Sequence, residues 1–252
     1  MRHFISLVLS LFSLQIGLVA APTPSINRGQ DLFVPILMYH HILDYPAPDP
    51  YFVSPDIFDK QMAWLRDNHY NVVRYEDFYH AARGEKTLPP HSVVISFDDG
   101  DIDQYTNAFP ILKKYHYSAI FYIPSNFIDH SHWMTLKMVE ELRDSGMEIA
   151  GHTVTHKILT QIPIEKQRKE IGFGKKSLEK QLDMPINFFA YPGGMHSSSS
   201  VALVKEFGFL SAATTHHSGH HLPGEDPYLV PRLHINNDLE SFIGMMEGKR
   251  TD

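Results

Sequence analysis

Residues 93–100 read VVISFDDG, an apolar run that ends in two adjacent carboxylates and a glycine. A short unbroken apolar run rich in β-branched residues is typical of a strand buried on both faces in a parallel sheet. Successive strand side chains point to opposite faces, so Asp98 and Asp99 can serve one site only if the backbone turns there, and Gly100 permits that turn. Folding does not require acids at this place. The stretch therefore predicts a parallel sheet with chemistry at the end of one strand.

Outward from this stretch, apolar runs of strand length alternate with segments of helical periodicity. Further strands are expected at 35–40, 72–73, 118–123, 147–150, 188–190, 209–213 and 228–235, and helices from 54, from 75, and at 103–115, 136–143, 164–182 and 201–207. The proline-rich segment 44–50 predicts an irregular loop. This alternation predicts an α/β fold, and we favour a distorted barrel of parallel strands over an open doubly wound sheet. In both folds active residues follow the carboxyl ends of strands.

The chain has 252 residues, a formal net charge of -7 and no basic stripe, so we expect no nucleic-acid partner. Residues 1–21 have the charged start and apolar centre of a secretory signal, although an uncleaved anchor stays open. A polar linker is expected at 22–31 and one globular domain at 32–252. No cysteine is present, so export is argued from the signal alone. We expect a secreted or periplasmic protein of the cell envelope, with no stable membrane span after signal removal.

Two histidines and one carboxylate predict a metal site. His152 and His156 are one helical turn apart, so both imidazoles can face one point in a helix or a tight loop. A carboxylate from another strand end would complete a set of ligands that leaves coordination positions open for water and substrate. The same set suits a non-haem iron oxygenase. The adjacent Asp98 and Asp99 favour hydrolysis, because one carboxylate can bind the metal while its neighbour accepts a proton.

Residues 96–100, SFDDG, and 152–156, HTVTH, resemble the first two motifs of the polysaccharide deacetylase family, also called NodB-homology or carbohydrate esterase family 4. The resemblance covers nearly the whole chain after the linker. It implies a NodB-like deacetylase barrel of parallel strands and a divalent metal bound by Asp99, His152 and His156. It also implies that Asp98 is the general base. Zinc is our first choice of metal, and the same ligands accept cobalt, nickel or iron.

The third motif departs from the common pattern of this family. In residues 189–194, FAYPGG, Ala190 stands where most members have an arginine that orients the catalytic aspartate. This variant is similar to the subgroup that includes deacetylases of poly-N-acetylglucosamine, so another residue must orient the aspartate or none does. We expect Tyr191, Pro192 and Gly193 to line the substrate and oxyanion side of the site, with a backbone N–H near Gly193 as the oxyanion donor.

Two histidines compete for the role of catalytic acid. Residues 35–41, PILMYHH, resemble the first strand of the circularly rearranged subgroup, in which the acid histidine precedes the acidic motif, and we therefore assign His40. The rival is His234 in residues 231–234, PRLH, which has the usual late position but carries Arg232 where the family has an apolar residue. A solvent-facing or core position in a strand would equally explain His234.

Together with the predicted metal site, the resemblance to this family implies a metal-dependent hydrolase of carbon–nitrogen bonds other than peptide bonds. It would remove N-acetyl groups from a β-linked polysaccharide that contains N-acetylglucosamine, and release acetate. An esterase that removes O-acetyl groups and a catalytically weak sugar-binding protein remain open as alternatives. Trp133 could line a sugar site or be buried, and His216, His217, His220 and His221 could bind metal but are better explained by a solvated loop. The sequence leaves the oligomeric state open.

Overall fold

The computed structural model describes residues 34–45, 49–215 and 225–248. The signal expected at 1–21 and the linker expected at 22–31 lie outside the described residues, as do His216, His217, His220 and His221. Among the described residues, no helix is both long enough and apolar enough to cross a membrane.

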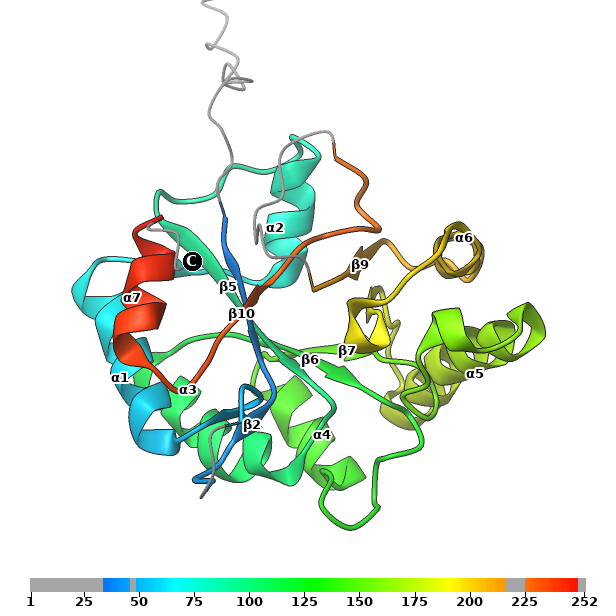
Figure 1. Cartoon of the computed structure of the whole chain (residues 1–252), viewed down its shortest axis with the longest axis horizontal. Helices are drawn as coiled ribbons and strands as arrows, with labels where there is room; N and C mark the ends of the chain where they lie inside the picture. Colours follow the sequence, from blue (N-terminus) through cyan, green and yellow to red (C-terminus); the bar gives the residue numbers. More distant parts are fainter. Residues whose placement is uncertain (1–33, 46–48, 216–224, 249–252) are drawn as a thin grey trace, which may run out of the picture.

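A curled sheet of eight strands, parallel at every pairing, forms the frame of the fold (Figure 1). The strands follow the order β10-β1-β5-β6-β7-β8-β9, and the short β4 also pairs with β5. Their bounds are β1 Ile36–Tyr39, β4 Asn71–Val72, β5 Ser92–Asp98, β6 Ile120–Ile123, β7 Glu148–Gly151, β8 Phe188–Ala190, β9 Ser211–Ala213 and β10 Leu233–His234. A parallel bridge between Ala213 and Val230 links β9 to the segment that continues into β10. The predicted distorted barrel of parallel strands is therefore confirmed.

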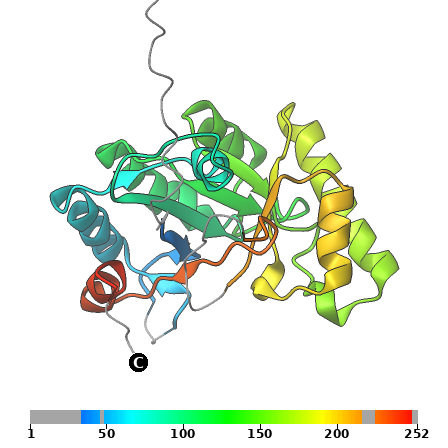
Figure 2. The same ribbon diagram turned by 90° about the horizontal axis from the view of Figure 1, so that it is seen from above.

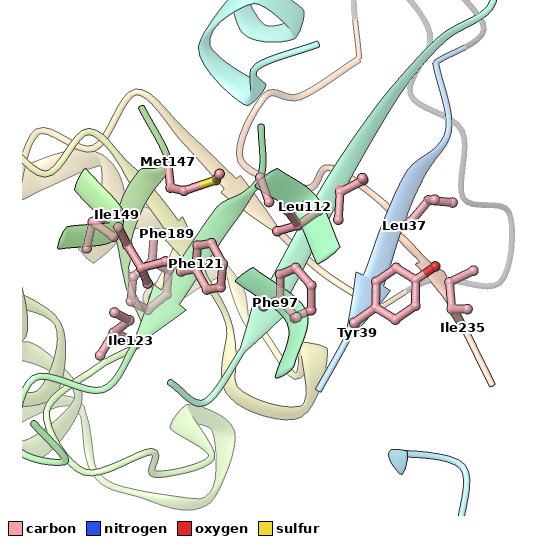
Figure 3. Packing of buried hydrophobic residues seen from close by; sticks show 14 of the residues in the cluster. Leu37, Tyr39, Phe97, Leu112, Phe121, Ile123, Met147, Ile149, Phe189 and Ile235 are labelled. Atoms are coloured by element: carbon pink, nitrogen blue, oxygen red, sulfur yellow. The ribbon is translucent and has the colours of Figure 1, made fainter. Parts of the chain in front are cut away.

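The outer face of the sheet carries the main hydrophobic core. Figure 3 shows Phe97, Phe121 and Phe189 pointing to this face from β5, β6 and β8. The rings of Phe97 and Phe121 stack with centroids 4.9 Å apart. Six helices contribute buried side chains to the same core: α1 Pro55–Asp67, α3 Phe109–Tyr115, α4 Leu136–Asp144, α5 Ile164–Leu182, α6 Ser198–Glu206 and α7 Leu239–Met246. Because the strand period is two, the residues between these core positions point to the inner face.

The inner face holds a smaller core and is closed at one end by α2, Tyr75–Ala82. Tyr75 and Phe78 of α2 pack with Val94 and Tyr122 of the sheet. The hydroxyl of Tyr75 lies 2.9 Å from the hydroxyl of Ser211, the first residue of β9, so α2 covers the amino ends of the strands. Figure 2 gives the second view of these layers. The carboxyl ends of the strands stay available for the residues that carry chemistry.

Two local expectations were wrong, and two elements were not predicted. A two-stranded parallel ribbon of β2, His41–Ile42, and β3, Phe52–Val53, was not predicted and flanks the proline-rich segment 44–50. The strand expected at 228–235 is regular only over β10. The helix expected at 103–115 begins with a π-helical turn, Gln104–Ala108, because Pro110 has no N–H for the α-helical ladder and its ring crowds the preceding turn. A C-terminal helix, α7 Leu239–Met246, was not predicted.

Candidate active site

A turn at the end of β5 brings both acids to one edge of the sheet. Asp98 ends the strand on the inner face, and the left-handed φ angles of Asp99, 78°, and Gly100, 73°, turn the chain. A Cβ at Gly100 would lie 3.0 Å from Cγ2 of Ile123, so both the φ angle and the space favour glycine. This turn is the one that the alternation of strand side chains requires if adjacent acids are to serve one site.

A buried arginine fixes the orientation of Asp98. Nη1 and Nη2 of Arg232 donate to Oδ1 and Oδ2 of Asp98 at 2.6 and 2.7 Å, and Nε donates to the carbonyl of Thr214 at 3.1 Å. The guanidinium also lies 5.0 Å from the centre of the Tyr122 ring. Burial by itself would raise the pKa of Asp98, but Arg232 outweighs burial and holds this pKa below its usual range. Asp98 is therefore an ionised carboxylate with one fixed orientation.

Sequence reasoning assigned no role to Arg232. Ala190, on β8, has no side chain that could orient Asp98, whereas Arg232 reaches it from the segment that precedes β10. Arg232 and His234 are two residues apart, so both point to the inner face. The sequence did contain a clue to this role, because a basic residue inside an apolar run of strand length needs a buried partner of opposite charge. Only the order of strands shows that this partner is Asp98.

Asp99, His152 and His156 form the candidate metal site. One ligand atom from each residue lies within 4.8 Å of the others. Oδ1 of Asp99 is 3.5 Å from Nε2 of His152 and 3.1 Å from Nε2 of His156, and no hydrogen bond of acceptable geometry reaches this buried oxygen. Burial would raise the pKa of Asp99, but the two imidazoles lower it well below its usual range. An ionised oxygen without a hydrogen-bond partner between two imidazole nitrogens fits a divalent cation.

Neighbouring groups hold the two histidines in place. Nδ1 of His152 lies 2.8 Å from the carbonyl oxygen of Ala190, which makes Nδ1 the donor and leaves Nε2 for a metal. The segment from His152 to His156 is a loop, not a helix, and Glu170 of α5 accepts hydrogen bonds from the backbone N–H groups of Val154 and Thr155 at 3.0 and 2.8 Å. This support could not be predicted from the sequence, because Glu170 lies in an ordinary amphipathic helix.

Close packing of α5 against the same loop depends on a glycine. A Cβ at Gly174 would lie 2.8 Å from the carbonyl carbon of Thr153, which has a left-handed φ of 67°. Real Cβ atoms do not approach a backbone atom this closely, so only glycine lets α5 support the ligand loop at this distance. The segment 172–177 is thus part of a packed helix.

The structure brings both candidate acids together. His40 directly follows β1 and His234 ends β10, and their ring centroids are 5.6 Å apart at nearly a right angle. Nδ1 of His40 and Nε2 of His234 are buried without a hydrogen-bond partner. Burial lowers the pKa of His40 to about 4 against the opposing charges of Asp98 and Asp99, and burial also lowers the pKa of His234. Both imidazoles are therefore neutral at pH 7.

The π-helical turn after Asp103 supports the backbone of His40. Nε2 of Gln104 donates to the carbonyl oxygen of His40 at 3.1 Å and also to that of Asp98. Asp103 accepts from the backbone N–H of Ile42 at 2.7 Å and lies 2.9 Å from Nδ1 of His41. The widened turn thus connects the strand that ends in the acids to the strand that ends in the histidines.

The third motif lies beside the ligands but presents less side-chain surface than expected. The ring of Tyr191 is fully buried, packs 5.3 Å from that of Phe189, and offers no face to a sugar. The backbone N–H of Tyr191 donates to Ala213 at 3.0 Å, and Pro192 has no N–H. Of the three residues, Gly193, with a left-handed φ of 59°, is therefore the remaining candidate for the predicted oxyanion donor. Trp133 is half-buried against Phe127, with ring centroids 4.4 Å apart.

Comparison with known proteins gives consistent matches. A family model described as polysaccharide deacetylase matches residues 85–212. The Bacillus subtilis (strain 168) protein YxkH is 29% identical over 182 residues, which are 72% of this chain and 64% of YxkH. A poly-beta-1,6-N-acetyl-D-glucosamine N-deacetylase of Staphylococcus aureus (strain MSSA476) is 26% identical over 214 residues, 79% of this chain and 73% of the relative. The chain thus spans less than two thirds of the length of YxkH.

One solved structure has a similar fold over most of this chain and nearly all of its own length. The Streptococcus pyogenes deacetylase PplD, in complex with acetate, superposes with a TM-score of 0.77 at 27% identity. The match covers 86% of this chain and 99% of PplD. The curled barrel described above is therefore the fold of a known deacetylase.

Proposed function

Because the chain belongs to the polysaccharide deacetylase family, we propose that it is a metal-dependent hydrolase that removes N-acetyl groups from a β-linked polymer containing N-acetylglucosamine. The observation that carries this proposal is the adjacency of two differently held acids. Asp98 is bound by Arg232, and Asp99 is shared by His152 and His156. One acid is thereby free to accept a proton while the other binds a cation.

Asp99, His152 and His156 would hold the metal. A divalent cation bound there supplies polarisation of the acetyl carbonyl and a lowered pKa of the attacking water. Zinc remains our first choice, since two imidazoles and one carboxylate are a common catalytic zinc set, and cobalt, nickel and iron accept the same ligands.

Asp98 would act as the general base. Its carboxylate accepts the proton of water while water attacks the acetyl carbonyl, and Arg232 keeps the carboxylate ionised and oriented before the attack. The backbone N–H of Gly193 would donate to the oxyanion that develops on the carbonyl oxygen. The C–N bond then breaks, acetate leaves, and the nitrogen departs as the amine of a glucosamine unit.

His40 would protonate the departing nitrogen. Since burial makes its imidazole neutral at pH 7, His40 has to gain a proton during the cycle, and the proton that Asp98 accepts from water is available for this transfer. His234 lies against His40 on the neighbouring strand and remains the rival for this role. Single replacement of each histidine by Gln separates the two, because the true acid is needed for amide cleavage but less for an ester with a good leaving group.

The choice of substrate rests on the resemblance of the third motif and on the Staphylococcus aureus relative, whose name states de-N-acetylation of poly-beta-1,6-N-acetyl-D-glucosamine. A substrate of this kind lies outside the cytoplasm, so the proposal includes a secreted or periplasmic location. The sugar-binding alternative rested on the alanine at 190. This reason no longer holds, since Arg232 binds Asp98 from the segment before β10.

Acetate release from the metal-loaded full chain tests the proposal. We would assay poly-N-acetylglucosamine, chitin oligomers, peptidoglycan and acetylated xylan, each with and without a chelator. The expected result is acetate from the N-acetylated polymers that disappears with the chelator and returns with added zinc. Acetate from acetylated xylan alone would assign an O-acetyl esterase instead. No acetate from any of the four would refute the hydrolase.

A further inference from the structure

We propose that the β2–β3 ribbon binds the polymer beside the catalytic residues, with the ring of Tyr51 as the surface on which one sugar unit packs. This inference rests on the proposed function and narrows its substrate to a neutral or cationic hexosamine chain. Three observations support it: the exposure of Tyr51, the contacts of Tyr51 with His40 and His234, and the charges around Tyr51.

Three large apolar side chains are exposed close together along the chain at this ribbon. Three of the eight that are exposed among the described residues are Leu43, Tyr45 and Tyr51, with 43, 51 and 51% of their surface accessible. Scattered single exposed residues need no explanation, but a group beside a candidate active site does. The ribbon therefore presents aromatic surface that folding leaves uncovered.

Tyr51 contacts the candidate acids directly. Its ring centroid is 4.8 Å from that of His40 and 5.2 Å from that of His234. A sugar whose amide nitrogen is protonated by one of these histidines must lie against it, so Tyr51 adjoins the reacting unit or the next one. A tyrosine ring offers an apolar face to the C–H groups of a pyranose and a hydroxyl to its oxygens.

The rings on the other side of the ribbon hold it in shape. Phe52 stacks between His41 and Tyr45, with centroid distances of 4.3 and 4.1 Å. The ribbon is also tied to the π-helical turn, since Asn107 donates to the carbonyl of Ile42 at 2.8 Å. Tyr51 is therefore presented by a supported backbone, which lowers the entropy lost when a sugar binds.

The charges near Tyr51 select the kind of polymer. Residues 34–54 contain no Lys or Arg but include Asp44 and Asp49. Oδ1 of Asp49 accepts from the backbone N–H of Tyr51 at 2.9 Å, so this carboxylate lies beside Tyr51. This acidic surface repels a chain that carries carboxylates and favours neutral N-acetylglucosamine units and the cationic glucosamine units that deacetylation leaves.

Oligosaccharide binding and turnover test the inference on the full chain. In an Asp98→Asn background, which blocks turnover, calorimetry would measure binding of a β-linked N-acetylglucosamine pentamer. Tyr51→Ala is expected to raise the Kd about 10-fold or more, in the range found when a stacked aromatic ring is removed. Tyr51→Trp should restore binding because it keeps a flat ring. Phe173→Ala, which removes a 57% exposed ring from α5, is the matched control and should leave the Kd unchanged.

Turnover distinguishes sugar binding from mere support of His40. With Asp98 intact, Tyr51→Ala should raise KM for the pentamer, whereas a supporting role would lower kcat. A pentamer with alternating muramic acid units should bind more weakly than the neutral pentamer. An unchanged Kd and KM in Tyr51→Ala, or tighter binding of the carboxylate-bearing chain, would overturn the inference. Either result can occur while acetate release proceeds normally, so this failure is distinct from failure of the proposed function.

Discussion

Two buried carboxylates lie at opposite ends of the inner face, and their partners differ. Asp98, at the carboxyl end of β5, is held by the guanidinium of Arg232. Glu148, at the amino end of β7, accepts the backbone N–H groups of Tyr75 and Glu76 at 2.7 and 2.9 Å, where α2 begins. The buried, doubly hydrogen-bonded guanidinium outweighs burial at Asp98, whereas the helix N-terminus and the exposed Arg74, 3.8 Å away, do not outweigh it at Glu148.

This difference appears in the pKa of each group. The pKa of Asp98 is lowered, while burial raises the pKa of Glu148 to about 7 despite the N–H groups and Arg74. A carboxyl that is ionised at all ordinary pH values can serve as a base in each cycle. A carboxyl that is half protonated near pH 7 serves the packing of α2. Burial of a carboxylate is therefore no sign of catalysis until its partner is known.

The largest expected effect is on acetate release, and it separates Asp98 from Glu148. Asp98→Asn should lower acetate release by about 100- to 10,000-fold, because the amide cannot accept the proton of water. Glu148→Gln should leave activity within a few-fold, since its partners lie at the other end of the strands. Acetate assays and metal analysis of both proteins provide the check. Normal turnover in Asp98→Asn, or loss of its metal, would remove the distinction between base and ligand.

Replacement of Arg232, the partner of Asp98, should have the second largest effect on activity. Arg232→Lys keeps the charge but cannot donate two parallel hydrogen bonds, so we expect kcat to fall about 10- to 100-fold with KM little changed. The unfolding free energy should also fall by a few kcal/mol (~2–4), because a buried pair is left poorly matched. Arg168 pairs in the same forked way with Glu206 on the surface, so Arg168→Lys is the control. Equal effects in both variants would contradict an orienting role.

A third carboxylate, Glu170, resembles Glu148 in accepting two backbone N–H groups but holds the loop of the metal ligands. Glu170→Gln should lower zinc affinity by about 10-fold, since groups that orient ligands contribute at this level. Glu179→Gln alters the same helix, at a residue that accepts the N–H of Ile186 at 3.2 Å. Competition with a chromophoric chelator measures both. If Glu170→Gln binds zinc as tightly as Glu179→Gln, the loop does not depend on Glu170.

The last prediction concerns how the free energy of unfolding depends on pH. The raised pKa of Glu148 means that the folded state binds more protons than the unfolded state between pH 4.5 and about 7, so its contribution to stability is lost as pH rises through that window. Glu148→Gln should flatten this fall by about 1–3 kcal/mol. Asp98 has the opposite sign: its contribution is present above pH 3.8 and lost as pH falls below it.

Chemical unfolding at several pH values measures these slopes. The wild-type chain and Glu148→Gln are compared between pH 4.5 and 7, in the presence of a chelator so that metal binding does not contribute. A slope that is the same in both proteins would show that Glu148 titrates normally.

Much of the fold could be predicted because strands buried on both faces and amphipathic helices have distinct periodicities. The helix predicted at 164–182 matches α5 in both bounds. The β2–β3 ribbon could not be predicted, because two strands of two residues each are too short to show a periodicity. The length of β10 was overestimated, because an apolar run does not show where pairing stops.

The sequence by itself determined the two acids, the turn that joins them and the histidine pair, since these residues are adjacent or closely spaced along the chain. Only the tertiary structure decided that Arg232 binds Asp98, that His40 and His234 lie together, and that Glu170 supports the ligand loop. These pairings depend on which strands become neighbours and how helices pack on the sheet. Strand order and helix packing follow from burial of the whole core, which no local pattern contains.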